Sequence, residues 1–461
     1  MQILIIIALV IVGVLLFELI IFSHEFGHFI TAKKSGVKVN EFSLGMGPKI
    51  LSFKRGETDY SLRLLPIGGF CSMEGEDEES PEPRAFNNAK IWKRMIIIIA
   101  GAVMNIILGF IMMFAYTVQA DSYASTTIGG FNPNSVSANC GIEAGDKITE
   151  LNGYSIWNSR DLQFAMATMN CKNVDGKTLQ IYKQDCAQES CAVYNKILDN
   201  NKNIDDSTVD KLFEILSDGC SRINASSSKE DAYNIYKMTG ESLYNEYYNG
   251  KKTFEPVNIK EEDTRLRYTS DVKVIRNGEE LELKDVQFFT YYKSEEDEKA
   301  EKTSVSFDFW VTETDKTFGT VISETISNTC SMAKMVWTSL VWLVQGRFSF
   351  SDLSGPVGIA TAVTHVASIG LETSFMDAFN NILFVMIIIT INLGIFNMLP
   401  FPALDGGKFL FLLIEWIFNK PIPRKAEQII NSVGFALLIV FMLIVTVKDV
   451  WQLVTGTMPG M

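Results

Sequence analysis

The sequence predicts a multi-pass α-helical membrane protein with about four transmembrane helices and a large polar domain between the second and the third. Its mean hydropathy is +0.13, which is high for a soluble chain of 461 residues. The apolar residues are gathered in blocks of about 20, the length that spans the hydrocarbon core of a bilayer. The net charge of −13 argues against a nucleic-acid-binding protein, because such a protein needs a basic face.

The first apolar block covers residues 3–22 and continues helically, so we predict transmembrane helix 1 over residues 1–32. A cleaved signal peptide is the alternative, but it would have a basic start and a small-residue cleavage site. The first three residues carry no positive side chain, and no such site precedes His24. Glu18 lies within this block, and the sequence indicates no role for it.

Three further blocks predict the other spans. Residues 95–118 form transmembrane helix 2, residues 378–418 form helix 3 with a break around residues 400–407, and residues 428–448 form helix 4. The apolar, tryptophan-rich residues 332–344 are too short for a span. We expect an interfacial helix there, within a linker at residues 316–377.

Basic residues in the short connections predict the orientation, because such residues favour the cytoplasmic side. They gather in the loop at residues 33–94 and before helix 4: Lys33, Lys34, Lys38, Lys49, Lys54, Arg55, Arg63, Arg84, Lys90, Lys93, Arg94, Lys420, Arg424 and Lys425. With four spans, both termini and the large domain lie outside. The end of helix 1 and the break in helix 3 then meet on the cytoplasmic side.

The pentad His24-Glu25-Phe26-Gly27-His28 follows the first apolar block. On a helix, His24 and His28 lie one turn apart on one face and can bind one zinc ion, while Glu25 can act as general base on a water molecule. A chance match is the alternative. However, the chain holds only three histidines, and ionisable side chains in an apolar span usually mark function. The third, His365, is expected to be structural or interfacial.

A catalytic zinc ion needs a third protein ligand and one open position. Asp405 is the candidate, because it lies in the break of helix 3, after two prolines and before two glycines. Irregular backbone at membrane depth is tolerated where it is buried in protein or lines a wet cavity. A turn that caps a helix is the alternative reading of Asp405-Gly406.

These motifs resemble those of intramembrane zinc proteases of the site-2 protease class, closest to the bacterial regulator-of-sigma-E protease family. The resemblance covers nearly everything except a central insertion. It rests on the pentad, on residues 392–407, and on shorter pieces at residues 45–48, 65–70, 354–359 and 379–453. It implies a Zn²⁺ cofactor held by His24, His28 and Asp405, with Glu25 activating water. Asn397 matches a family asparagine thought to contact the substrate or the tetrahedral intermediate, as an amide donor near a developing oxyanion could.

Two departures from the family pattern stand out. Ala102 replaces a family proline in Ala100-Gly101-Ala102-Val103-Met104-Asn105, which leaves the local geometry of helix 2 open. Lys408 follows the two glycines, where family members often carry His or Arg.

The resemblance also implies a membrane-associated β-hairpin within the cytoplasmic loop at residues 33–94. The hairpin corresponds to residues 39–73, and the alternating residues 60–64 would offer an edge to an unwound substrate strand.

Residues 119–315 are expected to form an extracytoplasmic PDZ-like α/β domain. Residues 139–153 resemble protease-associated PDZ domains, with Asn152-Gly153 suited to a type I′ hairpin. A short helix is expected at residues 161–169 and a second hairpin at residues 272–283, around Asn277-Gly278. Residues 185–267 are an insertion that we interpret as a helical decoration. Whether the domain binds a peptide end or acts as a size filter stays open.

Five cysteines fall in the outer region: Cys140, Cys171, Cys186, Cys191 and Cys220. In an oxidising space, Cys186 and Cys191 could pair with each other or with the rest. The odd count leaves one over, and the connectivity is not deducible from sequence.

The sequence therefore predicts a zinc endopeptidase in the bacterial plasma (inner) membrane that performs regulated proteolysis of single-span membrane proteins. By resemblance, the substrates are anti-sigma factors or remnant signal peptides. The predicted partners are these transmembrane substrates and the lipid bilayer, and the sequence does not determine the oligomeric state. A catalytically inactive scaffold is disfavoured by the intact ligand set. A metal transporter would spread its ionisable residues over several spans.

Overall fold

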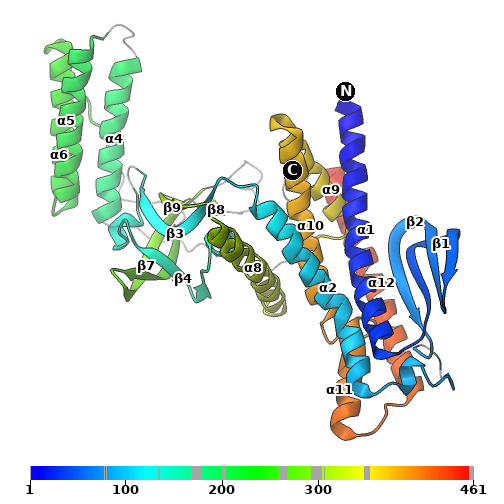
Figure 1. The fold of residues 1–461 in the computed structure, drawn as a ribbon. Helices are drawn as coiled ribbons and strands as arrows, with labels where there is room; N and C mark the ends of the chain where they lie inside the picture. Colours follow the sequence, from blue (N-terminus) through cyan, green and yellow to red (C-terminus); the bar gives the residue numbers. More distant parts are fainter. Residues whose placement is uncertain are drawn as a thin grey trace. The chain divides into compact units, whose positions relative to one another are not determined.

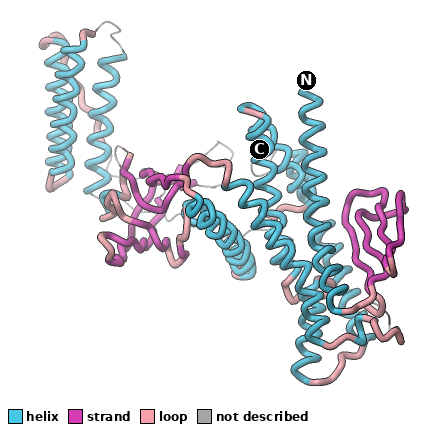
Figure 2. Tube along the Cα trace, in the orientation of Figure 1, coloured by secondary structure: helices cyan, strands magenta, loops and turns pink. Residues whose placement is uncertain are grey.

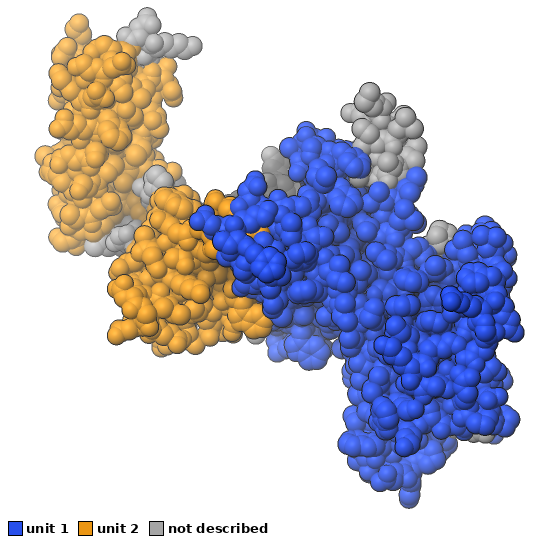
Figure 3. All heavy atoms as spheres, viewed as in Figure 1, with its two compact units in different colours: residues 1–121, 315–461 blue, residues 122–314 orange. Residues whose placement is uncertain are grey.

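The chain divides into two compact units in a computed structural model (Figure 3). The first is Met1–Asp121 with Asp315–Met461, and the second is Ser122–Thr314. The structure describes residues 2–76, 78, 80–132, 135–168, 179–199, 204–259, 267–291, 304–305, 307–346 and 353–455. The two units are treated separately below.

The first unit is mainly helical, as Figure 1 shows. Its helices are α1 (Gln2–Ser35), α2 (Ile91–Thr117), α8 (Phe318–Val344), α9 (Pro356–Thr373), α10 (Phe375–Asn397), α11 (Asp405–Phe418) and α12 (Arg424–Thr455). Four of the described helices are long and apolar enough to cross a membrane, at Ile11–Ser35, Ile91–Thr117, Phe375–Asn397 and Lys425–Thr455. They coincide with the four predicted spans, with α11 as a separate helix after the break.

The helix predicted at residues 332–344 is longer than expected. It is the second half of α8, which begins at Phe318 with a capping box between Thr317 and Thr320. The first half of α8 is polar, so a search for apolar runs detects only its end. The predicted linker also contains a second helix, α9.

Small residues let the membrane helices approach closely. A Cβ atom at Gly27 would overlap the Ala100 carbonyl oxygen, so α1 lies directly against α2. A Cβ atom at Gly109 would lie 2.7 Å from Cγ1 of Ile391, so α2 also lies against α10. The helix α2 runs unbroken through Ala102, where the family pattern has a proline.

The strands β1 (Val39–Arg55) and β2 (Thr58–Met73) form an antiparallel sheet, which lies beside α1 in Figure 1 and is magenta in Figure 2. Both strands bend back, so residues 41–44 pair with residues 59–62 on one side, and residues 39–44 pair with residues 69–73 on the other. The paired residues 39–42 and 71–73 of the sheet pack into a buried apolar cluster with Ala32, Ile97 and Leu412. Elsewhere the sheet exposes large apolar side chains: Met46, Ile50, Leu51, Phe53, Leu62, Leu64 and Leu65.

The prediction that residues 60–64 offer a free edge is wrong for the first part of that stretch. Tyr60 pairs with Phe42 on one side and with Phe53 on the other. Residues 69–73 pair with β1 on one side only, within the part of the chain that the structure describes. The alternating pattern of residues 60–64 is equally typical of a central strand, and the bend in β1 that covers them is not visible in the sequence.

The second unit contains a seven-stranded sheet of order β8-β7-β6-β4-β3-β9, with β5 paired to β4. The strands are β3 (Ser122–Phe131), β4 (Lys147–Leu151), β5 (Tyr154–Ser155), β6 (Arg267–Arg276), β7 (Glu279–Tyr291), β8 (Ser304–Val305) and β9 (Phe309–Asp315). Asn152 and Gly153 both have positive φ, of 48° and 80°, and so do Asn277 and Gly278, at 51° and 87°. Both Asn-Gly turns therefore have the φ signs of the predicted type I′ geometry. The predicted short helix is α3 (Ser159–Ala167).

The insertion forms the helices α4 (Leu179–Asp199), α5 (Asp206–Ala225) and α6 (Lys229–Tyr248), and α4 begins before the predicted boundary at residue 185. Their contact buries Cys186 and Tyr236.

Cys186 and Cys191 do not pair with each other. They lie five positions apart on α4, which turns their side chains to different faces of the helix. Cys191 and Cys220 are free thiols, and Cys171 lies outside the described residues. A hydrogen bond from the Cys220 thiol lowers the pKa of Cys191 to about 7.

Candidate metal centre

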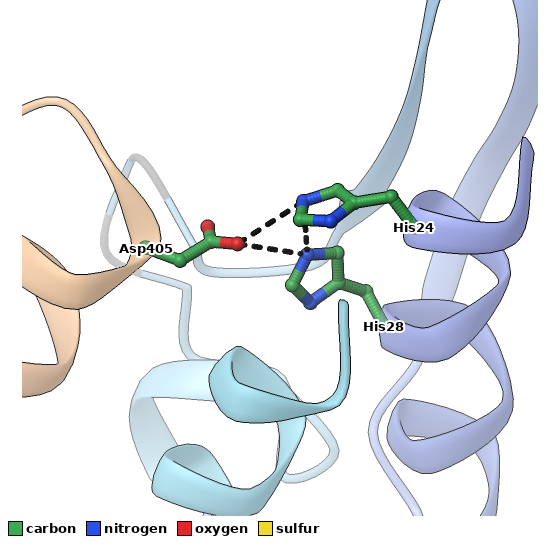
Figure 4. Close-up of side chains that lie close together, drawn as sticks. All are labelled: His24, His28 and Asp405. Carbon is green, nitrogen blue, oxygen red and sulfur yellow. Dashed lines mark hydrogen bonds and ion pairs between the residues drawn. The ribbon is translucent and has the colours of Figure 1, made fainter. Parts of the chain in front are cut away.

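Two distant parts of the chain bring three potential zinc ligands together (Figure 4). Near the C-terminal end of α1, His24 and His28 point to the same side, and their Nε2 atoms lie 3.2 Å apart. Oδ2 of Asp405 lies 3.1 Å from Nε2 of His24 and 3.3 Å from Nε2 of His28. The three ligand atoms all lie within 4.8 Å of one another. The sequence predicted these three residues as a ligand set, and the structure places them together.

The backbone before Asp405 is held in an unusual turn. Asp405 is the first residue of α11, and Ala403 adopts a positive φ of 73°, which is costly for a residue with a Cβ atom. The amide N–H of Ala403 donates to Oδ1 of Asn431 on α12, at 3.3 Å. Cβ atoms at Gly406 and Gly407 would overlap the carbonyl oxygens of Leu399 and Phe401. The two glycines therefore allow α11 to start directly against the preceding loop, which places Asp405 at the histidines.

The tautomer of His28 is set by the backbone of α2. Its Nδ1 lies 2.8 Å from the carbonyl oxygen of Ile97, which can only accept a hydrogen bond. Nδ1 therefore carries the proton, and the lone pair of Nε2 faces Asp405. A histidine that donates its other N–H to a carbonyl is the usual arrangement for a metal ligand.

His24 has a comparable partner in Asn105 of α2. The Asn105 amide nitrogen lies 3.4 Å from Nδ1 of His24, and the buried Asn105 amide oxygen has no hydrogen-bond partner among the described residues. When the oxygen and the nitrogen of this amide are exchanged, the oxygen accepts a hydrogen bond from the Nδ1–H group of His24. This orientation leaves the lone pair of His24 on Nε2, the atom that lies 3.1 Å from Asp405. The amide nitrogen of Asn397 lies 3.5 Å from that Nε2.

Replacement of Asn105 by Leu is expected to weaken zinc binding by about 10–100-fold, because the His24 ring loses the partner that orients it. Competition with a chromogenic chelator measures this affinity. Asn431→Leu on α12 is unsuitable as a control, because Asn431 holds the turn before Asp405. Asn381→Leu on α10 is the control, because the Asn381 amide donates to the Val366 carbonyl instead. An unchanged affinity in Asn105→Leu would contradict the role of Asn105.

The donor set fits zinc. Two imidazole nitrogens and one carboxylate oxygen are a known ligand combination for catalytic zinc. Oδ2 of Asp405 is buried, and apart from the two histidine rings the described residues offer it no hydrogen-bond donor, as expected of an atom that would bind a cation. Gly101 makes room at the centre, because a Cβ atom there would overlap Nε2 of His28 and lie 2.8 Å from Cε1 of His24.

Glu25 and the edge strand meet next to this centre. Glu25 follows His24 on α1, and a Cβ atom at Gly69 of β2 would lie 3.5 Å from Cγ of Glu25. The strand edge at residues 69–73 therefore runs past the predicted general base. Neither Gly69 nor Gly101 was singled out in the sequence as a site residue. The sequence signal at Gly101 is its place between two alanines in an otherwise bulky apolar helix. His365 lies on α9 and is not part of the ligand cluster among the described residues.

Known proteins and one protein family resemble this chain along nearly its whole length. The model of peptidase family M50 matches residues 12–441. The zinc metalloprotease RasP of Bacillus licheniformis is 32% identical over 455 residues, which cover 96% of this chain and 99% of that protein. The regulator of sigma-W protease RasP of Bacillus subtilis is 29% identical over 467 residues, covering 96% and 98%. The zinc metalloprotease RasP of Geobacillus kaustophilus is 27% identical over 455 residues, covering 95% and 96%.

Proposed function

The chain belongs to peptidase family M50 and is a zinc metalloprotease, and we propose that it hydrolyses single-span membrane proteins within or beside their transmembrane segment. The supporting observation is the position of the ligand cluster. His24 and His28 lie within Ile11–Ser35, a helix apolar enough to span a membrane, and Asp405 joins them from α11. A protease whose metal centre lies in an apolar span favours substrates that are themselves in the membrane.

His24, His28 and Asp405 would hold the zinc ion. When bound, zinc acts as a Lewis acid that polarises the scissile carbonyl and lowers the pKa of a bound water. Glu25 takes the proton from the attacking water and returns it to the leaving amine. Asn397 lies at the edge of the ligand cluster, where its amide can donate to the oxygen on which negative charge develops.

The β1–β2 sheet would present the substrate. A helical transmembrane segment hides its peptide bonds in internal hydrogen bonds, so it must unwind before hydrolysis. An unwound segment can pair with a free strand edge, and the edge at residues 69–73 passes Glu25 at Gly69. The exposed apolar side chains of this sheet suit immersion in the lipid.

The substrates we favour are anti-sigma factors, with remnant signal peptides as a second group. The name of the B. subtilis relative, regulator of sigma-W protease, supports the first group. We place the metal centre on the cytoplasmic side of the bacterial plasma membrane, because the basic residues cluster in residues 33–94 and 420–425. The second unit would then be an extracytoplasmic PDZ-like domain that binds a peptide end or filters substrates by size.

Removal of the metal tests this function. The purified full chain, reconstituted in lipid vesicles with a tagged single-span substrate, is expected to cut the substrate within or beside its span. A strong zinc chelator should abolish cleavage, and added Zn²⁺ should restore it, since the three ligands would bind the ion reversibly. Mass spectrometry of the products locates the cut. Cleavage that continues in the zinc-free protein, or a cut far from the membrane segment, would refute the proposal.

A further inference from the structure

An ion pair joins the loop that follows the strand edge to the helix that carries Asp405. Nζ of Lys408 lies 2.7 Å from Oε1 of Glu76, and the two side chains are 32% and 19% exposed. Glu76 comes three residues after the end of β2 at Met73, and Lys408 comes three residues after Asp405. The bond therefore links two segments that are 332 positions apart in the chain.

Each end of the ion pair is close to a functional group. The amide N–H groups of Gly407 and Lys408 both donate to the Leu404 carbonyl, so Lys408 lies in the same helical turn as Asp405. On the other side, the loop that holds Glu76 is joined to the sheet. Glu74 donates its amide N–H to the Lys38 carbonyl, directly after the edge at residues 69–73. A displacement of Lys408 relative to Glu76 would thus shift Asp405 relative to that edge.

Apolar packing alone would leave this arrangement less defined. Leu412 of α11 is buried in one cluster with Cys71, Met73 and Phe86, which come from the sheet and the loop after it. Apolar contacts are not directional, so they hold α11 against the sheet without fixing its rotation. A charged hydrogen bond of 2.7 Å does fix a direction. A second pair, Arg94 with Glu415 at 3.3 Å, ties α11 to α2. Glu76, Lys408 and Arg94 all line a cavity of about 210 Å³ beside the site.

We propose that the Glu76–Lys408 ion pair is a positioning contact that sets the register between the substrate-binding edge of β2 and Asp405. It presupposes the proposed function, because the register matters only if a peptide pairs with that edge. With the ion pair intact, one peptide bond of the paired segment lies at the metal centre. Without it, the edge can slide or tilt, and neighbouring bonds reach the centre as well.

The test uses the full chain in lipid vesicles with a tagged single-span substrate. Glu76→Gln and Lys408→Met each break the pair, and the double variant Glu76→Lys/Lys408→Glu rebuilds it with the charges exchanged. In each single variant we expect additional cut sites by mass spectrometry and a kcat reduced by up to about 10²-fold, the cost of a misplacement near 1 Å. KM and the bound zinc should change little. The double variant with exchanged charges should restore one dominant cut site. Lys408→Arg, which keeps the positive charge, should retain that site.

The distribution of cut sites separates positioning from mere stabilisation, because loss of folded protein lowers the yield without moving the cut. Lys273→Met is the matched control, since it breaks a pair with Glu150 of 2.9 Å and similar exposure in the second unit. An unchanged cut site in both single variants, or an altered one that the exchanged pair does not restore, would overturn the positioning role alone. A wild type that cleaves nothing would overturn both this role and the proposed function.

Discussion

Replacement of Asp405 by Asn is expected to remove zinc from the protein and to reduce proteolysis to background. Asp405 is the anionic member of the ligand set, and its Oδ2 is within 3.3 Å of both histidine Nε2 atoms. An amide oxygen carries no net charge, so it binds a dication in a buried site much more weakly than a carboxylate does. The loss of zinc affinity should exceed the roughly 10–100-fold that follows from losing only a partner of a ligand.

Zinc content per chain after dialysis, followed by cleavage of a single-span substrate, measures the effect. Asp377→Asn on α10 is the control, because this substitution removes the same charge. The Asp377 carboxylate accepts a hydrogen bond from Ser374 at the exposed start of the helix. The control should retain zinc and activity. An Asp405→Asn protein that keeps stoichiometric zinc would show that the third ligand lies elsewhere.

The membrane helices and the cluster of His24, His28 and Asp405 could be predicted from the sequence because their patterns are local. The spacing of His24 and His28 follows from the pitch of one helix, and apolar blocks of sufficient length are visible without any tertiary information. Asp405 was found by the same local reasoning, since prolines and paired glycines mark a break in an apolar run. The structure adds the reason for the glycines, which is the direct contact of α11 with the loop before it.

Other features depend on contacts between distant segments and left no local pattern. The bend of β1 makes residues 59–62 a central strand and residues 69–73 the edge, and alternation of polar and apolar residues cannot distinguish the two. Lys408 was noted only as a departure from the family pattern, because its partner Glu76 lies far away in the sequence. The polar first half of α8 has no apolar run, so its helix was predicted too short. In each case the sequence shows which residues are present but not which surface they meet.

Replacement of Glu25 by Gln is expected to reduce peptide hydrolysis by roughly 10²–10⁴-fold while zinc stays bound. Glutamine has nearly the same size as glutamate and fits the same place beside Gly69 of β2, but it cannot accept a proton from water at neutral pH. Glu25 follows His24 on α1 and is not one of the three clustered ligands, so its loss should leave the affinity for zinc nearly unchanged. The substrate should still bind, because the strand edge at residues 69–73 is intact.

Cleavage rates, zinc content and co-purification of uncut substrate together test this prediction. Glu18→Gln is the matched control, since it makes the same substitution on the same helix seven residues earlier and should leave the rate unaltered. Cleavage at the wild-type rate by Glu25→Gln would show that another group accepts the proton, and loss of zinc would show that Glu25 helps to bind the metal. Compared with Asp405→Asn, which should lose zinc and hydrolysis together, Glu25→Gln should lose hydrolysis alone. That contrast separates the residue that moves the proton from the residues that hold the ion.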